Sequence, residues 1–472
     1  MKYVFKPAPN YRTKDSTLRI MNDLTIGLVA VLLFALYNAS TFSGANVTHL
    51  VMLTVSAVVT SFVVEIAFAK MMKQNVMKCI KSSFPWVTPL ILVLICPMNT
   101  SVYAVVVCTF IGVLFGKLVF GGFGHNIFNP AAVGRAVLAA SFMSSVAVDV
   151  VTGATPTATM ASLGWATSTE SFNTMIEAFG GLQGMLMGTY AGALGETCSI
   201  LIILVGIFYA VRNVIDWRVP VVYIATIFLG ASLVAVVFGM GVWYPLFHVL
   251  TGGALFGAVF MLTDPVTNPT TRVGRLVFAM GAGFLTLTIR LVANLPEGVL
   301  FSILIMNMMV PTIDRLFDGQ QFYQSKKHIS VLAAVALVGL VVIGVCASTL
   351  EPKEVAAEGS YNAGSSISLA DDFSANNAEV LSVDGNVYHV KSFGFAGDNE
   401  FDITIVDGVV ESVVFTAFND TVGLGDLADN SAFLATFVGA SDDSFTTDAV
   451  SSATMTSKAV AAAVATALES AK

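Results

Sequence analysis

The residues whose side chains are best suited to carry out chemistry belong to a nine-residue pattern that occurs twice in the chain. Residues 149–157 read DVVTGATPT, and residues 448–456 read DAVSSATMT. Both fit D-x-V-[ST]-[GS]-A-T-x-T, which places one carboxylate and several hydroxyl groups in a short segment. Because Ser and Thr are preferred at helix starts, either copy alone could be an ordinary helix cap. Two copies in otherwise different parts of the chain favour a shared chemistry at their hydroxyl groups.

A second candidate is the glycine-rich segment GGFGHNIFNP, residues 121–130. It holds two amides, Asn126 and Asn129, and amide side chains offer both donors and acceptors to the edge of a flat ring. The competing interpretation is a glycine-rich turn that re-enters the membrane region, because irregular backbone is tolerated there when protein surrounds it. The segment therefore predicts either a ligand site or a structural turn.

Two carboxylates, Glu65 and Asp264, lie within or at the end of long apolar runs. Ionisable side chains at membrane depth are costly and usually mark a path for ions or protons. Both positions are near the expected ends of their runs, so the carboxylates could instead extend to water at the membrane surface. The five cysteines show no paired spacing, and no metal site or disulfide framework is predicted.

The elements that must position these residues are membrane helices. Of the 472 residues, 56% are hydrophobic and only 11% are charged, a composition far from that of a soluble protein. A helix needs about 20 apolar residues to cross the hydrocarbon core, and eleven runs approach that length. They begin near Leu24, Val47, Trp86, Ser101, Ala131, Ala193, Val219, Leu246, Leu276, Val299 and Ile329. The run at Trp86 and the run from Leu250 to Leu262 are the weakest of the eleven. The chain is therefore expected to be a polytopic α-helical membrane protein with ten spans followed by one more.

Charge divides the chain into two modules and orients it. Residues 1–350 carry 19 Lys and Arg against 12 Asp and Glu, whereas residues 351–472 carry 4 against 19. The basic clusters fall on alternate connections between the runs, which the positive-inside rule assigns to the cytoplasm. Residues 149–196 contain no Lys or Arg and are expected outside, and the last span would deliver the acidic module to the same side. The polar, basic start of the chain reads as a cytoplasmic lead-in without a signal peptide. An acidic surface also argues against nucleic acid as a partner.

The acidic module has the pattern of a small α+β domain. Residues 351–366 read as a polar tether. Four runs of alternating apolar and polar residues follow, within residues 378–418, and Asp407-Gly408 between the last two predicts a tight hairpin. An alanine-rich helix is expected over residues 457–472.

An Asn-Pro pair followed by Val-Gly-Arg also occurs twice, over residues 129–135 and 268–275. Asn-Pro pairs start turns and open helices. This repeat suggests two related halves, as in transporters with paired broken helices, although the two copies have unequal ranks among the expected spans.

The nine-residue pattern resembles the flavinylation motif D-x-x-[ST]-G-A-T of the Rnf and sodium-pumping NADH:quinone oxidoreductase complexes. In that family a flavin transferase links the phosphate of FMN to the hydroxyl of the last threonine, so the resemblance implies covalent FMN on Thr155 and Thr454. The other matching positions are Asp149 and Thr152 in the first copy and Asp448 and Ser451 in the second. The second copy has Ser452 where the family has glycine. Free N–H groups at a helix start would suit a phosphoester.

The resemblance extends over essentially the whole chain. Residues 1–320 resemble the D-type subunit of Rnf complexes, residues 321–350 form a connecting segment with a single membrane helix, and residues 351–472 resemble the G-type subunit. The chain is thus similar to a natural fusion of the two. In the family, asparagines like Asn126 and Asn129 help to hold a noncovalent riboflavin. A Gly-Leu-Gly loop, here Gly423, Leu424 and Gly425, approaches the flavin of the G-type subunit, and the usual preceding E-T-P-G appears as residues 420–423, DTVG.

The function that this resemblance implies is that of an electron-transfer subunit in a complex that couples ferredoxin:NAD⁺ oxidoreduction to Na⁺ or H⁺ translocation. The implied partners are Rnf subunits of the A, B, C and E types, a flavin transferase, membrane lipid and, indirectly, ferredoxin and NAD. The implied location is the inner, or cytoplasmic, membrane of a prokaryote. Two alternatives stay open: a B- or C-like subunit of the sodium-pumping quinone reductase, and a solute transporter with an outer sensing domain that needs no flavin.

Overall fold

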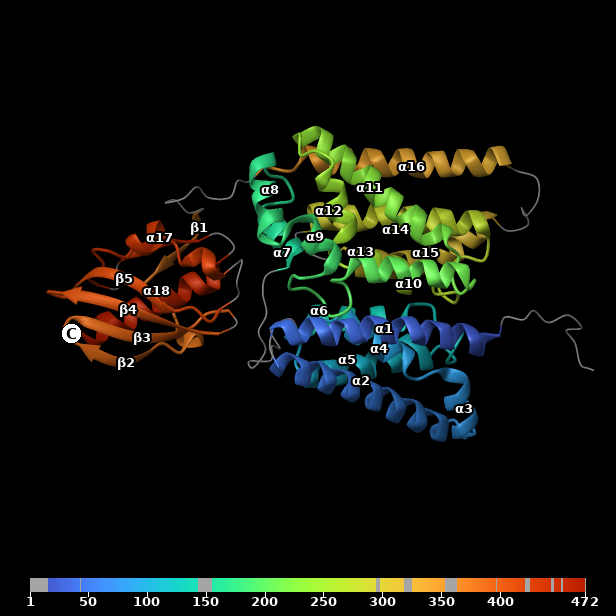
Figure 1. The fold of residues 1–472 in the computed structure, drawn as a ribbon, viewed down its shortest axis with the longest axis horizontal. Helices are drawn as coiled ribbons and strands as arrows, with labels where there is room; N and C mark the ends of the chain where they lie inside the picture. The colour runs from blue at the N-terminus through green and yellow to red at the C-terminus, as the bar shows by residue number, and fades with distance from the viewer. Residues whose placement is uncertain are drawn as a thin grey trace, which may run out of the picture.

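The computed structural model consists of a helical body and a strand-rich C-terminal domain (Figure 1). It describes residues 16–42, 44–142, 155–293, 298–317, 325–352, 363–395, 397–420, 425–442, 445–450 and 453–471. The first part of the body contains α1 (Thr17–Phe42), α2 (Gly44–Met71), α3 (Val76–Ser83), α4 (Val87–Leu94), α5 (Val102–Val113), the π-helix η1 (Leu114–Leu118) and α6 (Pro130–Ser141). The second part contains α7 (Pro156–Ser162), α8 (Thr169–Ala178), α9 (Gly181–Met187), α10 (Ser199–Val211), α11 (Arg218–Phe238), α12 (Trp243–Leu250), α13 (Ala254–Phe256), η2 (Gly257–Met261), α14 (Arg272–Val292), α15 (Val299–Phe317) and α16 (Ser325–Ser348).

Each of the eleven expected apolar runs coincides with a helix of the body. Among the described residues, six helices are long and apolar enough to cross a membrane: α1, α2, α11, α14, α15 and α16. The two weakest runs correspond to helix pairs bent by 45° between α3 and α4 and by 60° between α12 and the η2 segment. Two further runs form shorter apolar helices, Val102–Leu118 and Ser199–Val211. The protein is therefore helical with several candidate membrane spans, and the number of crossings stays a prediction.

The long helices of the body run roughly parallel, which creates two distinct ends (Figure 1). The helix α3 lies at one end, and α7, α8 and α9 lie at the other, on the side of the C-terminal domain. The segment 149–196, which the charge pattern predicts on the same side as the acidic module, includes these three helices. The helix α3, which carries Lys78 and Lys81, therefore lies at the opposite end of the body from α7–α9.

Glycines let α5 and η1 lie directly against the start of α6. A Cβ atom on Gly116 would come within 2.8 Å of the Cα atom of Pro130, and one on Gly134 within 2.8 Å of the carbonyl oxygen of Cys108. Small residues at such contacts allow the close backbone approach on which helix packing in membranes depends. This packing fixes the glycine-rich segment 121–129, which connects η1 to α6.

The Asn-Pro repeat marks two similar connections. In the first, the π-helix η1 leads through a loop to Asn129, which caps α6. In the second, η2 leads through a loop to Asn268-Pro269 and then to α14, whose cap is Thr271. The π-helices bring Lys117 and Phe260 to the lining of one pocket. The two related connections therefore converge on one site.

The C-terminal domain packs a sheet against one long helix. The strands are β1 (Ala363–Ser368), β2 (Glu379–Asp384), β3 (Val387–Phe393), β4 (Asp398–Val406), β5 (Val409–Ala417) and β6 (Thr446–Val450), with helices α17 (Ser431–Ala435) and α18 (Thr454–Ser470) and the 3₁₀ turns η3 (Ser374–Asn376) and η4 (Gly425–Ala428). Strands β2 to β5 form an antiparallel meander. Asp407 and Gly408 both have positive φ, 51° and 77°, as a type I′ hairpin turn requires. The expected hairpin and the four predicted strands are confirmed.

Two expectations about this domain need correction. Residues 363–366 of the presumed tether belong to β1, which pairs antiparallel with β6. The C-terminal helix begins three residues earlier than expected, at Thr454 itself. The physical reason for the first error is that a strand in a two-stranded ribbon needs no run of alternating apolar residues. The apolar face of the main sheet, including Val390, Phe401 and Ile403, forms one core with α18 residues such as Val460 and Val464.

Candidate functional site

Thr155 is the first residue of a tight helical start at the α7 end of the body. It has an extended backbone, with φ −83° and ψ 149°, and its Oγ1 accepts a hydrogen bond of 3.1 Å from the N–H of Ala158. Pro156 follows at the first helical position, where its fixed φ is favourable and its missing N–H costs nothing. The hydroxyl of Thr157 lies 3.1 Å from the Thr155 hydroxyl. The expected acceptor is thus a helix cap whose side chain is half-buried.

A pocket of about 270 Å³ opens beside Thr155. It is lined by Thr155, Pro156, Thr157, Tyr190, Gly192, Ala193, Glu196, Thr197 and Gly252. Its floor is held by Arg290, which is fully buried and donates to the carbonyl oxygens of Thr251 and Gly252 at 3.0 and 2.9 Å. A guanidinium that bonds several backbone carbonyls fixes the turn that carries them. The turn that contributes Gly252 to the pocket lining is therefore held by a buried guanidinium, and Glu196 adds a carboxyl group to the same lining.

Thr454 also begins a helix, α18, in the C-terminal domain. Here the cap residue is Ala453, which offers no side-chain hydrogen bond, so the Thr454 hydroxyl is not used as a cap. Its side chain is half-buried and the next residue, Met455, is exposed. Asp448 of the same motif copy lies on β6, opposite Ser366 of β1, with an exposed side chain.

A buried carboxylate, Asp420, ties the start of α18 to two loops. It accepts a hydrogen bond of 2.6 Å from the Thr456 hydroxyl and one of 2.9 Å from the N–H of Phe395. Gly425 lies against the same pair, because a Cβ atom there would be 3.0 Å from the Thr456 Oγ1. The structure thus brings one residue of the expected Gly-Leu-Gly loop beside the helix that begins with Thr454.

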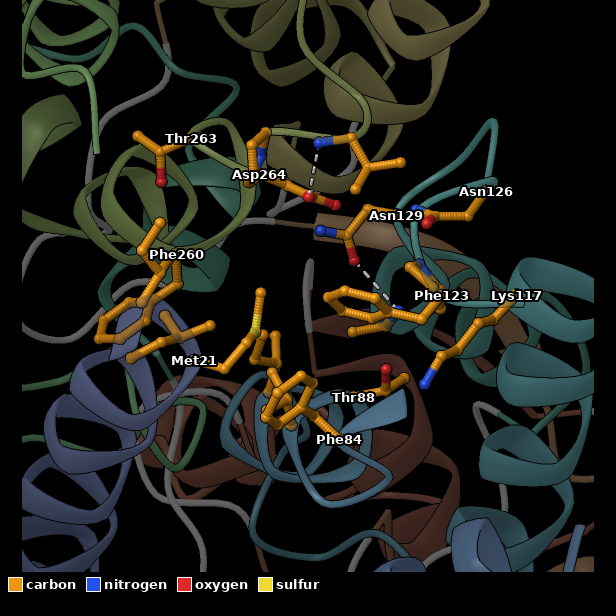
Figure 2. Close-up of a pocket in the computed structure, with 18 of the residues that line it drawn as sticks. Met21, Phe84, Thr88, Lys117, Phe123, Asn126, Asn129, Phe260, Thr263 and Asp264 are labelled. Carbon is orange, nitrogen blue, oxygen red and sulfur yellow. Dashed lines mark hydrogen bonds between the residues drawn. The ribbon is translucent and has the colours of Figure 1, made fainter. Parts of the chain in front are cut away.

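A larger pocket lies in the helical body near the glycine-rich segment. It encloses about 770 Å³ of empty space, part of it open to the surroundings. Figure 2 shows Asn126, Asn129 and Asp264 around it with the aromatic rings of Phe84, Phe123 and Phe260. Rings and amides around one cavity suit a flat aromatic ligand with polar edges.

The two asparagines differ in what they can offer to a ligand. The Oδ1 of Asn129 caps α6 by accepting from the N–H groups of Ala131 and Ala132 at 3.1 and 3.3 Å. Its amide nitrogen has no partner among the residues that the structure describes. The amide nitrogen of Asn126 donates to the carbonyl oxygen of Phe128 at 3.0 Å. Asn129 can therefore offer only its amide N–H groups to a ligand, because its side-chain oxygen caps α6.

The carboxylates Glu65 and Asp264 have different surroundings. Glu65 is only 1% exposed and accepts a hydrogen bond of 2.7 Å from the ammonium of Lys117, which is itself 4% exposed. The same ammonium donates to the Ser83 carbonyl oxygen at 2.7 Å. Extension of Glu65 to water, one of the two expectations, is wrong, because a buried cation holds its carboxylate. Asp264 lines the larger pocket and accepts from the N–H of Val266 at 3.0 Å.

Several expected site residues lie outside the described residues: Asp149, Thr152, Ser451, Gly423 and Leu424. The residues that sequence reasoning did not assign to a site are Lys117 and Asp420. Lys117 was visible only as a basic residue between spans, and its partner Glu65 is 52 positions away. The segment 420–423, DTVG, gave a signal for Asp420, because Asp420 occupies the position of the glutamate in the E-T-P-G that the G-type subunits have before the Gly-Leu-Gly loop.

Comparison with known proteins agrees with this arrangement of two parts. Residues 4–323 match the NQR2, RnfD, RnfE family, and residues 394–469 match the FMN-binding domain. The chain is 32% identical to the D-type subunit of the proton-translocating ferredoxin:NAD(+) oxidoreductase complex of Clostridium ljungdahlii, over 68% of this chain and 96% of that protein. It is 33% identical to the D-type subunit of the Na(+)-translocating ferredoxin:NAD(+) oxidoreductase complex of Acetobacterium woodii, over 67% and 93%. It is also 33% identical to the B-type subunit of the Na(+)-translocating NADH-quinone reductase of Chromohalobacter salexigens, over 49% and 57%.

The match to the first family covers more than half of the chain, and the first two relatives are matched over nearly their whole length. The expected resemblance to a D-type subunit is thereby confirmed, and the second match is consistent with a fused G-type subunit. The chain belongs to the NQR2, RnfD, RnfE family and carries an FMN-binding domain at its C-terminal end.

Proposed function

We propose that this protein is an electron-transfer subunit of an Rnf-type complex and carries covalent FMN on Thr155 and Thr454. The observation that supports this proposal most strongly is the repeated motif, whose two threonines both begin helices, one in the family's membrane part and one in the region that matches the FMN-binding domain. One motif copy in each part gives the chain two flavins that could exchange electrons. Covalent attachment prevents loss of the cofactor and leaves the protein to position it and tune its electronics.

The proposed reaction is ferredoxin:NAD⁺ oxidoreduction coupled to translocation of Na⁺ or H⁺. Two relatives that are matched over nearly their whole length are named for these substrates, one with protons and one with Na⁺, so either ion fits. The quinone-reductase relative is matched over a smaller share of its length, which favours the ferredoxin reaction. The chain would act with the other Rnf subunits, and a flavin transferase would be needed for its maturation.

Membrane vesicles with the assembled complex test the reaction. Reduced ferredoxin is expected to bleach the flavin absorption, and NAD⁺ is expected to restore it. Vesicles that contain the Thr155→Val/Thr454→Val variant should lose ferredoxin-dependent NAD⁺ reduction, because the proposed carriers are absent. Undiminished NAD⁺ reduction by that variant would contradict the role in electron transfer.

We propose the inner membrane of a prokaryote as the location, with the C-terminal domain outside the cytoplasm. The charge asymmetry supports this topology, as does the position of α7–α9 at the opposite end of the body from α3 (Figure 1). Reporter fusions after Gln320 and after Asn362 are expected to report opposite sides of the membrane. A cytoplasmic signal from the second fusion would overturn the placement of both motif copies.

The larger pocket is proposed to hold a noncovalent riboflavin, with Asn129 as a donor to the ring. Acid extraction of the purified protein should release riboflavin, and Asn129→Ala should release less, by up to about tenfold at limiting flavin, for the loss of one hydrogen bond. Asn129→Ser is the matched variant, because serine can still cap α6 but withdraws the amide from the pocket. An unchanged yield from Asn129→Ser would show that the amide is only a cap.

Glu65 and Asp264 are proposed to contribute to cation movement. The supporting observation is that both lie in or beside the larger pocket, Asp264 in its lining and Glu65 behind Lys117. Asp264→Asn is expected to lower ion transport by the reconstituted complex while the covalent FMN content stays the same. Full transport by this variant would remove Asp264 from the path.

A further inference from the structure

The last threonine of each motif copy has a buried, hydrogen-bonded hydroxyl that the proposed attachment does not consume. Thr157 is 3% exposed and Thr456 is 1% exposed. Each lies two residues after the proposed acceptor in the sequence. A buried hydroxyl is normally hydrogen-bonded, so the informative point is the partner, which is the Thr155 hydroxyl for Thr157 and the Asp420 carboxylate for Thr456.

In the membrane part, Thr157 contacts the acceptor directly. Its Oγ1 lies 3.1 Å from the Thr155 Oγ1, which also accepts from the N–H of Ala158. A hydroxyl has one proton and two lone pairs. With Ala158 on one lone pair and Thr157 as second partner, the Thr155 hydroxyl is held in one rotamer at the edge of the pocket. A held rotamer reduces the freedom that the oxygen must lose before it can react.

In the C-terminal domain, Thr456 acts through a carboxylate. Residues two apart on a helix project about 200° from each other, so Thr456 faces inward when Thr454 faces outward. The inward hydroxyl donates to Asp420 at 2.6 Å. Asp420 in turn holds the Phe395 N–H and lies against Gly425. The first turn of α18 is thereby fixed to the loops around it, and the orientation of Thr454 is fixed with it.

We infer that Thr157 and Thr456 are positioning residues for flavin attachment, each through its hydroxyl. The inference rests on the proposed covalent sites at Thr155 and Thr454. In the attachment step, the acceptor Oγ1 forms a bond to the flavin phosphorus while the bond from that phosphorus to its leaving group breaks, and the hydroxyl proton passes to a base of the transferase. The positioning residues form no bond to the flavin. They raise the fraction of time in which the acceptor oxygen is aligned for in-line attack on the phosphorus.

The test measures how fast flavin is incorporated into the full chain in cells where the transferase is induced at a set time. Each site is followed alone, Thr155 in the Thr454→Val parent and Thr454 in the Thr155→Val parent, by fluorescence in a denaturing gel. Thr157→Val and Thr456→Val keep the shape and remove the hydroxyl, and are expected to slow their own site by about tenfold. Thr157→Ser and Thr456→Ser keep the hydroxyl and should stay within about twofold of the parent.

Hydroxyl residues elsewhere on the same helices are the matched controls. Ser162 on α7 and Thr466 on α18 donate to backbone carbonyls of their own helices, those of Thr159 and Ala462. Ser162→Ala and Thr466→Val are therefore expected to incorporate flavin at the parental rate. If a valine variant does not fold, as seen by its elution in size exclusion, the cysteine variant replaces it, because cysteine has the shape of serine but only a weakly hydrogen-bonding thiol.

The outcomes separate this inference from the proposed function. A dark parent with active transferase would refute the covalent site itself, and the inference with it. A bright parent with parental rates in the valine variants would refute the inference alone. A serine variant as slow as its valine counterpart would also refute it, because side-chain shape and not the hydroxyl would then be responsible.

Discussion

Replacement of both Thr155 and Thr454 by valine is expected to leave a folded chain without covalent flavin. Valine has nearly the shape of threonine but no oxygen to form the ester. In a denaturing gel under ultraviolet light, wild type expressed with a flavin transferase should fluoresce, and each single variant should keep about half of that signal because each site carries one of two flavins. The double variant should be dark.

Unfolding of the variants would not explain the loss of fluorescence. Thr155 caps α7, and loss of a cap costs about 1 kcal/mol, which a stable fold tolerates. Thr454 provides no cap hydrogen bond, so its replacement should cost less. Thr271 gives the matched control, because its hydroxyl caps α14 through the N–H of Gly274 at 3.1 Å outside any motif copy. Thr271→Val should keep the full fluorescence.

Two outcomes of this experiment would change the assignment of the flavin sites. A fluorescent double variant would place the flavin on other residues. Complete darkness of Thr155→Val alone would mean that the second motif copy, with Ser452 in the position of glycine, is not modified. The C-terminal domain would then serve as a docking module without its own covalent cofactor.

Lys117→Met is expected to destabilise the helical body by about 3 to 5 kcal/mol. The ammonium is the hydrogen-bond partner of Glu65 Oε1, and among the described residues the other carboxylate oxygen, Oε2, has no partner. Removal of the cation leaves a buried carboxylate that must either stay unpaired or take up a proton. Unfolding in mixed detergent micelles measures the loss.

Two further variants separate charge pairing from packing. The Glu65→Gln/Lys117→Met double variant removes both charges and should recover most of the stability, since replacement of a whole buried pair is often nearly neutral. The exposed Lys81 on α3 is the control, and Lys81→Met should stay within about 0.5 kcal/mol of wild type. A double variant less stable than Lys117→Met alone would contradict the pairing argument. If the recovered double variant still transports ions fully, Glu65 is not part of the ion path.

The elements of the protein were predictable where the pattern is local. Apolar runs identify the helices, and the two weakest runs fall on the bent pairs α3–α4 and α12–η2, where a break shortens the continuous apolar helix. In the C-terminal domain, alternation over residues 378–418 predicts the meander, and Asp407-Gly408 predicts its last turn. The strand β1 was not predicted because AGSSIS has little apolar alternation.

The sequence predicted the motifs of the candidate site but not which side chains the fold brings together around them. The repeated pattern indicates which hydroxyl groups share a chemistry, and the resemblance to the flavinylation motif indicates which of them is modified. The pairing of Lys117 with Glu65 and the contact of Asp420 with Thr456 join residues 52 and 36 positions apart. A single sequence carries no signal for such distances, since only the fold brings these side chains together. The Asn-Pro pair predicts a helix start at Asn129, and the contacts with Ala131 and Ala132 add that the side-chain oxygen is used as the cap.

The most direct test of covalent flavin on both threonines is mass spectrometry of peptides from the full-length protein, purified after expression with a flavin transferase. We expect the peptide with Thr155 and the peptide with Thr454 each to be heavier by one FMN less one water, and fragment ions to locate the added mass on these two residues. Both peptides at their unmodified mass, from a preparation in which the transferase modifies another acceptor protein, would contradict covalent attachment at these sites.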